Sequence, residues 1–364
     1  MEALKDSDWR VRRAAAEALG TFERHGARTV PALMDLLHDP AGGVRCSAAI
    51  ALGKLGRKSS ETARALNELG RNADPGTKLS VTIALALLGK MEDDWIPVLL
   101  DATKGPDDST ADASAAALQR MISKNPEKLL SGILDSIDEA EEAQFERLLL
   151  VLRSMGPLAS EALPRVAPLY EKQSTQGRKD LISAFVAIDK KGDHTVPLLI
   201  GALKDPDSEV RREALLGFVR YRSKVTLYVG ALIEALDDEV PKNKLIALRI
   251  LRGFSTAASE AVPAVAACTR DPDPKVRTEA LRTLTALAKP DPDIVRICQE
   301  RLGDRDQTVQ CAAVQTLRQV GVKEPSMVVP LLEEALKAEK QEKIRTCIGS
   351  ALRFIARKTG RPQG

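Results

Sequence analysis

Apolar residues recur at helical spacing along the whole chain, and the pattern itself repeats. In each copy three or more apolar side chains fall on one helical face, as Val276, Ala280 and Leu284 do. The last apolar position of each copy is Leu19, Leu52, Leu87, Leu118, Leu152, Val186, Phe218, Leu251, Leu284, Leu317 or Leu352, so that consecutive copies lie 31 to 35 residues apart. The spacing predicts one amphipathic helix in each copy, which we call helix B.

A second apolar segment precedes each helix B and predicts a partner helix, helix A. Several of these segments open with Val-Pro, at Val30, Val196, Val262 and Val329. Proline is tolerated in a first helical turn, because its missing N–H would have no partner there. Aspartates in the following turn suit the N-cap of helix B. Helical pairs with this period over the full length indicate an all-α solenoid, in which each pair packs on its neighbours.

The turn and the start of helix B share a phrase, in which an aspartate is followed five residues later by Val-Arg. Copies begin at Asp6, Asp39, Asp205 and Asp271, and a fainter one begins at Asp304. This phrase resembles the HEAT-repeat family, in particular the bacterial repeats also called phycobilisome-lyase-like. The resemblance is strong over residues 4–56 and 195–355. It is degenerate over residues 57–194, where Ala111, Phe145 and Lys179 stand in place of the arginine.

The resemblance implies a right-handed superhelix of about eleven stacked two-helix repeats, of which the first is a half-repeat. It implies one solenoid over residues 1–364, and in solenoids of this family helix B typically lines the concave side. The family name says little about function, since one fold hosts many functions.

Arginines and aspartates recur in matching register from repeat to repeat. The arginines that follow the repeat valine, or its counterpart, are Arg12, Arg45, Arg211, Arg277 and Arg345, with Lys179 and Lys244 in equivalent places, and the turn aspartates are Asp39, Asp205, Asp271 and Asp304. One interpretation is a cationic ridge that binds phosphates. We favour a structural ladder in which each arginine binds a turn aspartate of its own or an adjacent repeat, because the planar guanidinium fork suits carboxylates.

The position six residues after the repeat valine predicts a partner-binding row on helix B. It is apolar at Ile50, Leu85, Leu150 and Leu216 and basic at Arg249 and Arg282, and further arginines follow one turn later at Arg252, Arg318 and Arg353. These residues predict a groove with an apolar stretch and a basic end that accepts an acidic segment of a partner. The alternative is that the apolar side chains are buried between repeats and that the arginines are ordinary solvated charges.

Composition favours neither nucleic acid nor membrane as a partner. The 54 basic and 51 acidic side chains leave a formal charge of +3, and aromatic residues make up only 3% of the chain. The five cysteines form no CxxC pair, and the first residues lack an apolar signal core. We therefore expect a cytoplasmic protein, monomeric and without a membrane span.

Candidate catalytic chemistry is sparse. The three histidines, His25, His38 and His194, lie in separate repeats. The di-iron deoxyhypusine hydroxylases, which are HEAT-repeat enzymes, place His-Glu pairs after the repeat arginine, and no such pair occurs in this sequence. The helical-repeat alkylpurine DNA glycosylases need an aromatic cradle, whereas Trp9 and Trp95 are far apart in the sequence. No residue set identifies a bilin lyase.

The sequence thus predicts a non-catalytic scaffold that binds a protein or peptide on the surface of helix B and needs neither a cofactor nor a metal. An acidic partner would suit the basic end of that surface. The alternatives are a nucleic-acid-binding HEAT protein that uses the basic C-terminal part of that surface, and a bilin-lyase-like accessory enzyme.

Overall fold

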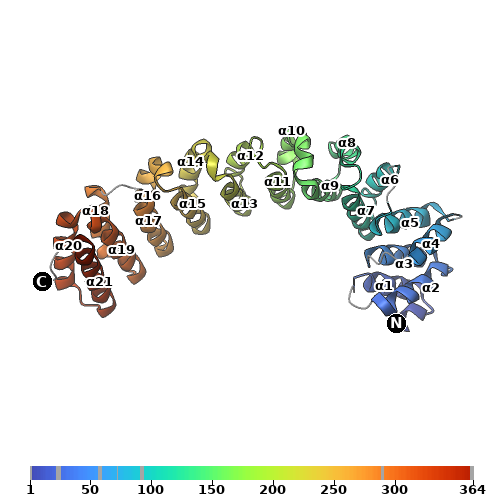
Figure 1. The fold of residues 1–364 in the computed structure, drawn as a ribbon, viewed down its shortest axis with the longest axis horizontal. Helices are drawn as coiled ribbons and strands as arrows, with labels where there is room; N and C mark the ends of the chain where they lie inside the picture. The colour runs from blue at the N-terminus through green and yellow to red at the C-terminus, as the bar shows by residue number, and fades with distance from the viewer. Residues whose placement is uncertain are drawn as a thin grey trace. The chain divides into compact units, whose positions relative to one another are not determined.

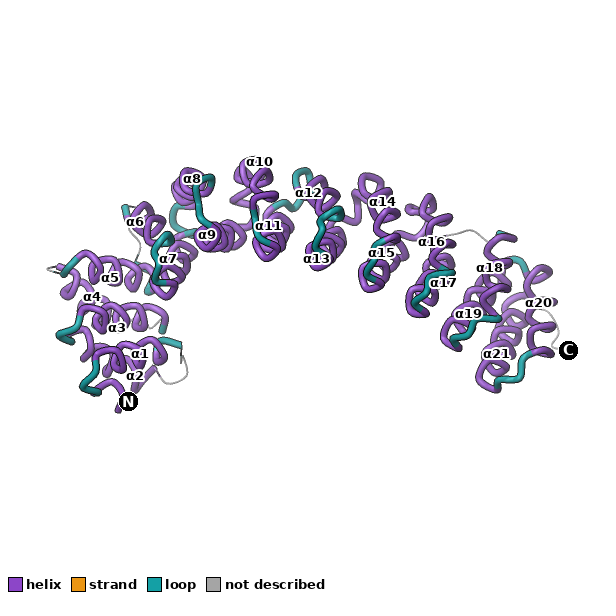
Figure 2. The backbone as a smooth tube through the Cα atoms, turned by 180° about the vertical axis from the view of Figure 1, so that it is seen from behind, coloured by secondary structure: helices purple, strands orange, loops and turns teal. Residues whose placement is uncertain are grey.

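The computed structural model describes residues 2–21, 26–55, 60–71, 73–90, 94–287 and 291–360, without the side chains of residues 26–28. All regular elements in these ranges are helices, and the tube in Figure 2 shows only helices and connecting loops there. The chain divides into two units, Met1–Lys190 and Lys191–Gly364. The organisation of residues 1–364 as a single solenoid stays a prediction.

Unit 1 is a stack of helical hairpins in which the odd-numbered helices are the predicted B helices (Figure 1). They are α1 (Trp9–Leu19), α3 (Gly42–Lys54), α5 (Pro75–Leu87), α7 (Asp108–Met121), α9 (Glu142–Met155) and α11 (Thr175–Ile188). The A elements are η1 (Glu2–Lys5), α2 (Gly26–Asp35) with η3 (Leu36–His38), α4 (Ser60–Arg71), α6 (Trp95–Ala102), α8 (Pro126–Ile137), and η4 (Gly156–Ala162), α10 (Leu163–Val166) and η5 (Ala167–Lys172) together.

Unit 2 repeats the same arrangement. Its B helices are α13 (Ser208–Phe218), α15 (Pro241–Phe254), α17 (Pro274–Leu287), α19 (Gln307–Lys323) and α21 (Glu342–Thr359). Its A elements are α12 (Thr195–Ala202), η6 (Val219–Lys224) with α14 (Val225–Glu234) and η7 (Ala235–Asp237), η8 (Ser255–Ala261) with α16 (Val262–Cys268), α18 (Pro292–Leu302) and α20 (Pro325–Ala338). Each final apolar position of the sequence pattern lies in a B helix, so the predicted all-helical solenoid of stacked hairpins is confirmed.

Side chains in the turns cap the B helices. Asp207 Oδ1 accepts hydrogen bonds from the backbone N–H groups of Glu209 and Val210 at the start of α13, and Asp306 accepts one from Thr308 N at the start of α19. Each such bond satisfies an N–H that has no partner inside the helix. The turn therefore ends helix A and starts helix B at a defined residue.

Consecutive B helices pack directly on one another within each unit. Between α1, α3 and α5 the helices approach closely through glycine. A Cβ on Gly20 would lie 2.9 Å from Ala51 Cβ, and one on Gly53 would lie 2.7 Å from Ala84 Cα. Within each unit, aliphatic side chains of helices A and B form a buried core between the hairpins, as a stack of hairpins requires.

Among the described residues, no helix combines the length and the apolar character needed to cross a bilayer.

Candidate partner-binding surface

Arg277 shows how the repeat arginine works in this fold. Its Nε and Nη2 lie 2.9 and 2.7 Å from Oδ2 and Oδ1 of Asp304, in the turn of the next repeat. Its Nη1 donates to the backbone oxygens of Asp271 and Pro272, at 2.9 and 3.0 Å, in the turn before its own helix. The guanidinium therefore ties two successive turns together, and its side chain is only 5% exposed.

The same geometry recurs in both units. The other forked pairs are Arg12 with Asp39 (2.7 and 2.9 Å) and Arg211 with Asp238 (2.7 and 3.1 Å), and Lys244 Nζ lies 2.8 Å from Asp271 Oδ2. In each case the acid follows the base by 27 residues. These side chains are largely buried. They are therefore poorly placed to bind a phosphate, and we assign them to the structural ladder.

The pairs hold their carboxylates in the charged form. The hydrogen bond from Arg12 keeps the pKa of Asp39 below its usual value. Burial acts to raise the pKa of Asp238 and of Asp304, but the hydrogen bonds from Arg211 and Arg277 and from backbone N–H groups outweigh it, so both pKa values are lowered. The ladder is thus built from full charges that neutralise each other.

Some members of the predicted ladder take other roles. Arg45 reaches the next turn by one longer contact, 3.3 Å from its Nη2 to Oδ2 of the half-exposed Asp74. Arg345 Nη1 donates to the backbone oxygens of Leu336 and Glu339. Asp205, by contrast, makes the same local contacts as the ladder acids Asp39 and Asp271: its Oδ1 accepts from the backbone N–H two residues later and its carbonyl accepts from the arginine six residues later. The sequence interpretation missed Asp74 and Asp238 as ladder acids.

The assignment of Lys179 to the ladder is wrong by one residue. In every ordinary copy the arginine is the fourth residue of helix B and donates to the carbonyl five residues before it. In α11 that residue is Arg178, whose Nη1 lies 2.8 Å from the backbone oxygen of Gln173. The turn before α11 lacks the aspartate-proline phrase and is capped by Ser174 instead, which displaced the alignment.

The predicted apolar row on helix B divides into exposed and buried members. Leu150 and Leu216 are each 49% exposed, as a binding row requires. Ile50 and Leu85 are only 5% and 4% exposed, so the expectation that they face a partner is wrong. Leu85 belongs to the aliphatic core of this part of unit 1, and Ile50 lines the hollow between its B helices that is described below.

Leu216 lies at the edge of an apolar groove between α13 and α15. The groove has a volume of about 250 Å³, and its lining includes Val219, Ile246, Ile250 and Phe254. Val219 is 51% exposed. Arg222 stands at one side, where its guanidinium carbon lies 5.6 Å from the centroid of the Phe254 ring and its Nη2 donates to the backbone oxygen of Gly253. Arg249 also lines the groove.

Three of the predicted arginines gather around one buried carboxylate on α17. Glu279 is 5% exposed, and its Oε1 lies 2.8 Å from Arg252 Nη1. Its Oε2 lies 3.9 Å from Arg249 Nε and 3.8 Å from Arg282 Nη1. Arg249 and Arg282 are 61% and 51% exposed, so their contacts to Glu279 are long and leave most of each guanidinium in solvent. The cluster carries three positive charges against one negative charge.

The last two predicted arginines are apart from this cluster. The guanidinium carbon of Arg318, on α19, lies 4.8 Å from the centroid of the Phe354 ring on α21. Arg353 is exposed on α21. The structure therefore brings Leu216, Arg249, Arg252 and Arg282 onto one continuous surface of unit 2, whereas Leu150 belongs to unit 1.

With this geometry in view, comparisons with known proteins identify the repeat. A family model of HEAT repeats matches residues 1–86 and 229–293. These two segments are HEAT repeats. The hairpins between and after them have the same HEAT-like fold. No curated protein matches the sequence.

Solved structures with this HEAT-like fold are distant in sequence. Kap95p, solved with RanGDP, is 14% identical with a TM-score of 0.52, over 98% of this chain and 55% of that one. Kap121p is 13% identical with a TM-score of 0.54, over 99% of this chain and 48% of that one. The complex of Kap121p with RanGTP gives 13% identity and a TM-score of 0.54, over 98% and 48%. The chain thus spans about half the length of these proteins, and the likeness concerns the fold alone.

The hairpins hold little that resembles a catalytic centre in the part of the chain that is described. His38 and His194 are exposed in different units, and His25 lies outside the described residues. No group of three or more His, Cys, Asp or Glu side chains there could hold a metal ion. The model that matches the sequence describes a repeat and not an enzyme.

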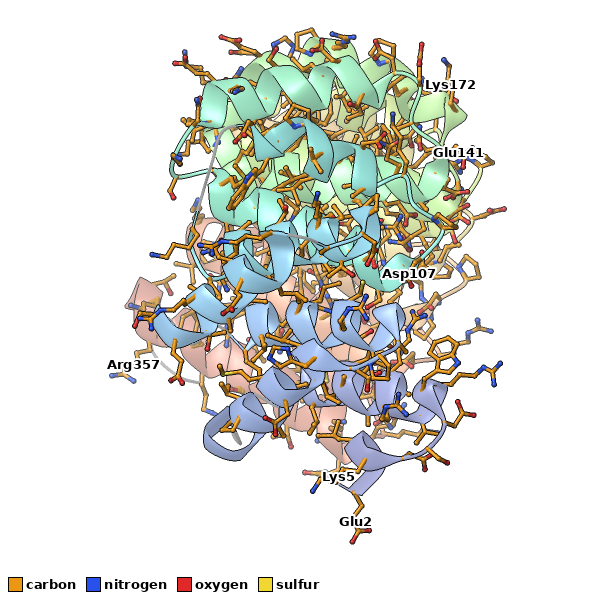
Figure 3. All side chains as sticks on the ribbon, turned by 90° about the vertical axis from the view of Figure 1, so that its right-hand side faces the viewer. Glu2, Lys5, Asp107, Glu141, Lys172 and Arg357 are labelled. Atoms are coloured by element: carbon orange, nitrogen blue, oxygen red, sulfur yellow. The ribbon has the colours of Figure 1, made fainter. Side chains whose placement is uncertain are left out.

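A second hollow lies in unit 1, where α1, α3 and α5 meet the start of α7. Its volume is about 510 Å³. Arg13 crosses it, with its Nε 2.8 Å from Glu17 Oε1 and its Nη2 3.5 Å from Oδ1 of Asp107, the turn residue labelled in Figure 3. Glu17 also accepts from Ser47 Oγ at 2.9 Å. Arg13, Glu17, Ser47 and Asp107 thus bind one another, and Lys54 also lines the hollow.

The cysteines behave mainly as small apolar residues. Burial raises the pKa of Cys268 to about 11 and that of Cys298 to about 12, so both stay protonated at neutral pH. Cys311 Sγ and Cys347 Sγ lie 3.1 Å apart between α19 and α21. Burial also raises the pKa of Cys311 to about 11, and the neighbouring thiol adds to that effect.

Proposed function

We propose that the chain is a non-catalytic scaffold that holds a protein partner on the surface formed by its B helices. The observation that carries the proposal is the half-exposed apolar pair Leu216 and Val219 at the groove between α13 and α15. Contiguous apolar surface that meets solvent commonly marks an interface. Exposed guanidiniums beside it add directional binding, and arginine is enriched in the parts of interfaces that carry most of the affinity.

The distant relatives of known structure fit this proposal. Structures with the same fold have been solved with RanGTP and with the extreme C-terminus of the phosphatase Cdc14p, both of which are proteins. Because the likeness extends only to the fold, the proposal rests on the surface of this chain and not on those partners.

The test compares two leucines of unit 2 that are both about half exposed or more. Leu216 lies at the groove of helix B, whereas Leu227 is 62% exposed on α14, an A helix. We expect Leu216→Glu to remove at least nine-tenths of the bound partner in affinity capture from an extract of the source organism, with quantitative mass spectrometry as the readout. Leu227→Glu is the matched control and should retain it. Equal retention by both variants, or equal loss, contradicts the proposal.

Nucleic acid is the second candidate, because Arg249 and Arg282 are exposed and close together. It is less well supported, since the neighbouring groove is apolar and the face of Phe254 is shared with Arg222 instead of being open to a base. Binding to phosphates would weaken steeply with added salt, whereas binding in an apolar groove tolerates salt. A salt titration of the captured complex separates the two.

A bilin-lyase-like activity is the remaining alternative, and it is suggested only by the likeness of the repeat phrase to phycobilisome-lyase-like repeats.

The thiols of Cys268 and Cys298 are buried, and free thiols suit a reducing compartment. We therefore place the scaffold in the cytoplasm.

A further inference from the structure

Two neighbouring junctions between B helices in unit 2 have apolar side chains at one junction and charged side chains at the equivalent positions of the other. At the first junction Leu216 of α13 meets Ile246 of α15 across the apolar groove. At the second, Arg249 of α15 meets Glu279 of α17 in the charged cluster. Arg249 follows Leu216 by 33 residues, and Glu279 follows Ile246 by the same number. The apolar and charged sites are therefore consecutive copies of one structural position.

The two sites are continuous. Arg249 lines the apolar groove and also belongs to the arginine cluster, so no other side chain needs to separate them. Helices that pack on each other lie about 8–10 Å apart. An extended peptide advances about 3.3 Å per residue. A strand of chain that crosses the B helices would therefore pass from one site to the next in about three residues.

The charge at the second site is only partly neutralised. Glu279 makes its short contact with Arg252, at 2.8 Å, while its distances to Arg249 and Arg282 are 3.9 and 3.8 Å. These two side chains are more than half exposed, and at these distances neither guanidinium donates a hydrogen bond to Glu279. A carboxylate placed between them would gain charge-assisted hydrogen bonds, since the guanidinium fork matches a carboxylate.

We propose that this surface binds an extended segment of a partner protein that carries an apolar side chain and a carboxylate about three residues apart. The apolar side chain occupies the groove of Leu216, Val219 and Ile246, and the carboxylate lies between Arg249 and Arg282. This inference rests on the proposed function, and it adds the chemistry and the spacing of the bound segment. The segment runs across the B helices and bridges three repeats of unit 2.

Both sites must be occupied for useful affinity. The groove is small, at about 250 Å³, so it takes one side chain and not a helix face. An exposed ion pair alone contributes little in water. An apolar anchor next to the carboxylate excludes water from one side of Arg249 and holds the acid in place. The recognition is thus of a pair of residues, which gives a specific and testable spacing.

The experiment selects a phage-displayed library of random twelve-residue peptides on the full chain. We expect the enriched peptides to share a large apolar residue and an Asp or Glu at a separation of three residues, in one direction or the other. The strongest peptide, synthesised with a fluorescent label, is then titrated by fluorescence anisotropy. Arg249→Gln/Arg282→Gln, Arg249→Glu/Arg282→Glu and Leu216→Glu should each weaken it by tenfold or more.

The matched control reverses two other exposed arginines of the same unit. Arg270→Glu/Arg296→Glu changes charges that lie near Glu300, away from the groove, and should alter the dissociation constant less than twofold. A peptide in which Lys replaces the acidic residue should regain affinity for the Arg249→Glu/Arg282→Glu variant. Circular dichroism of every variant checks that it is folded, and the neutral glutamine pair keeps the test valid if charge reversal beside Glu279 disturbs the fold.

Several results overturn the proposal. They are a library without enriched peptides, enriched peptides without an acidic residue or without a fixed spacing, and loss of binding in the control variant. Tighter binding of a labelled single-stranded oligonucleotide than of any peptide, abolished by Arg249→Glu/Arg282→Glu, would assign the cluster to nucleic acid instead. The proposed scaffold function is judged separately by Leu216→Glu against Leu227→Glu on the native partner, so that either idea can fail while the other stands.

Discussion

The hairpins around α13 to α19 and those around α5 to α9 reach the same fold with different polar contacts. In the first region Arg211, Lys244 and Arg277 each bind the aspartate of the next turn. In the second region the same helical position holds Ala111 in α7 and Phe145 in α9, and both are buried. An apolar residue can therefore occupy the position of the ladder arginine without loss of the hairpin stack.

The second region still holds its turns, but with an arginine from another position. Arg147, two residues after Phe145, reaches back to the preceding repeat. Its Nη2 and Nε lie 2.6 and 2.8 Å from Asp108 and Asp112, and its Nη1 lies 3.1 Å from the backbone oxygen of Thr103. The regular ladder points forward along the chain and this contact points backward. In both regions an arginine links the turns of neighbouring repeats, although it comes from a different position of helix B.

The largest loss of stability is expected when the buried phenyl ring that stands at the ladder position of α9 is removed. We expect Phe145→Ala to lower the free energy of unfolding of unit 1 by about 3–5 kcal/mol, because a fully buried aromatic side chain leaves a cavity. Urea unfolding followed by circular dichroism measures the change. A loss below about 1 kcal/mol would contradict the idea that packing at this position substitutes for the ion pair.

The second-largest loss of stability is expected on removal of the most deeply buried ladder arginine, Arg277. Arg277→Ala leaves Asp304, 4% exposed, without its two short partners, and we expect a loss of about 2–3 kcal/mol in unit 2 with partner binding retained. Hydrogen exchange of α17 and α19 measures it. An unchanged melting temperature would count against the ladder.

The ion pair of Arg277 and Asp304 also predicts how the stability of unit 2 changes at low pH. Because the folded pKa of Asp304 lies below the unfolded value of about 3.9, its contribution is present above pH 4 and is lost as the pH falls through the folded pKa. Arg277→Ala should therefore flatten the loss of stability of unit 2 below pH 4.

The smallest effect is expected where the ladder is most exposed. Arg45 holds Asp74 by one contact of 3.3 Å, and that aspartate is already stabilised by Thr77, whose side-chain and backbone hydrogen bonds lower the Asp74 pKa to about 2. Exposed pairs of this kind contribute little. Arg45→Ala should leave the unfolding midpoint within experimental error of the wild type, and a loss as large as that of Arg277→Ala would show that burial does not set the strength of the ladder.

Helix B could be predicted throughout because stacking imposes its period on every repeat, even where the phrase is lost. The ladder could be predicted only where the turn reads Asp-Pro or a close variant. Before α11 the turn reads Gln173-Ser174, and the assignment slipped to Lys179 in place of Arg178. Asp238 was missed because Asn243-Lys244 stand five and six residues after it, where the phrase has Val-Arg.

The exposure of the binding row could not be read from one helix at a time. Ile50 and Leu216 occupy the same register, yet only Leu216 faces solvent. The exposure of such a position depends on the neighbouring helices, which a pattern within one helix does not describe. Glu279 was likewise invisible as the centre of three arginines, because two of them come from α15, a different helix.

The interval of 27 residues between ladder partners has a practical consequence for dissecting the chain. A fragment that ends cleanly after α17 keeps whole hairpins, but it discards Asp304 and leaves the Arg277 side chain without its acid. Fragments should instead end beyond the turn that follows the next A helix, so that every retained arginine keeps its aspartate. A boundary placed at the end of a hairpin would separate a ladder arginine from the aspartate that it binds.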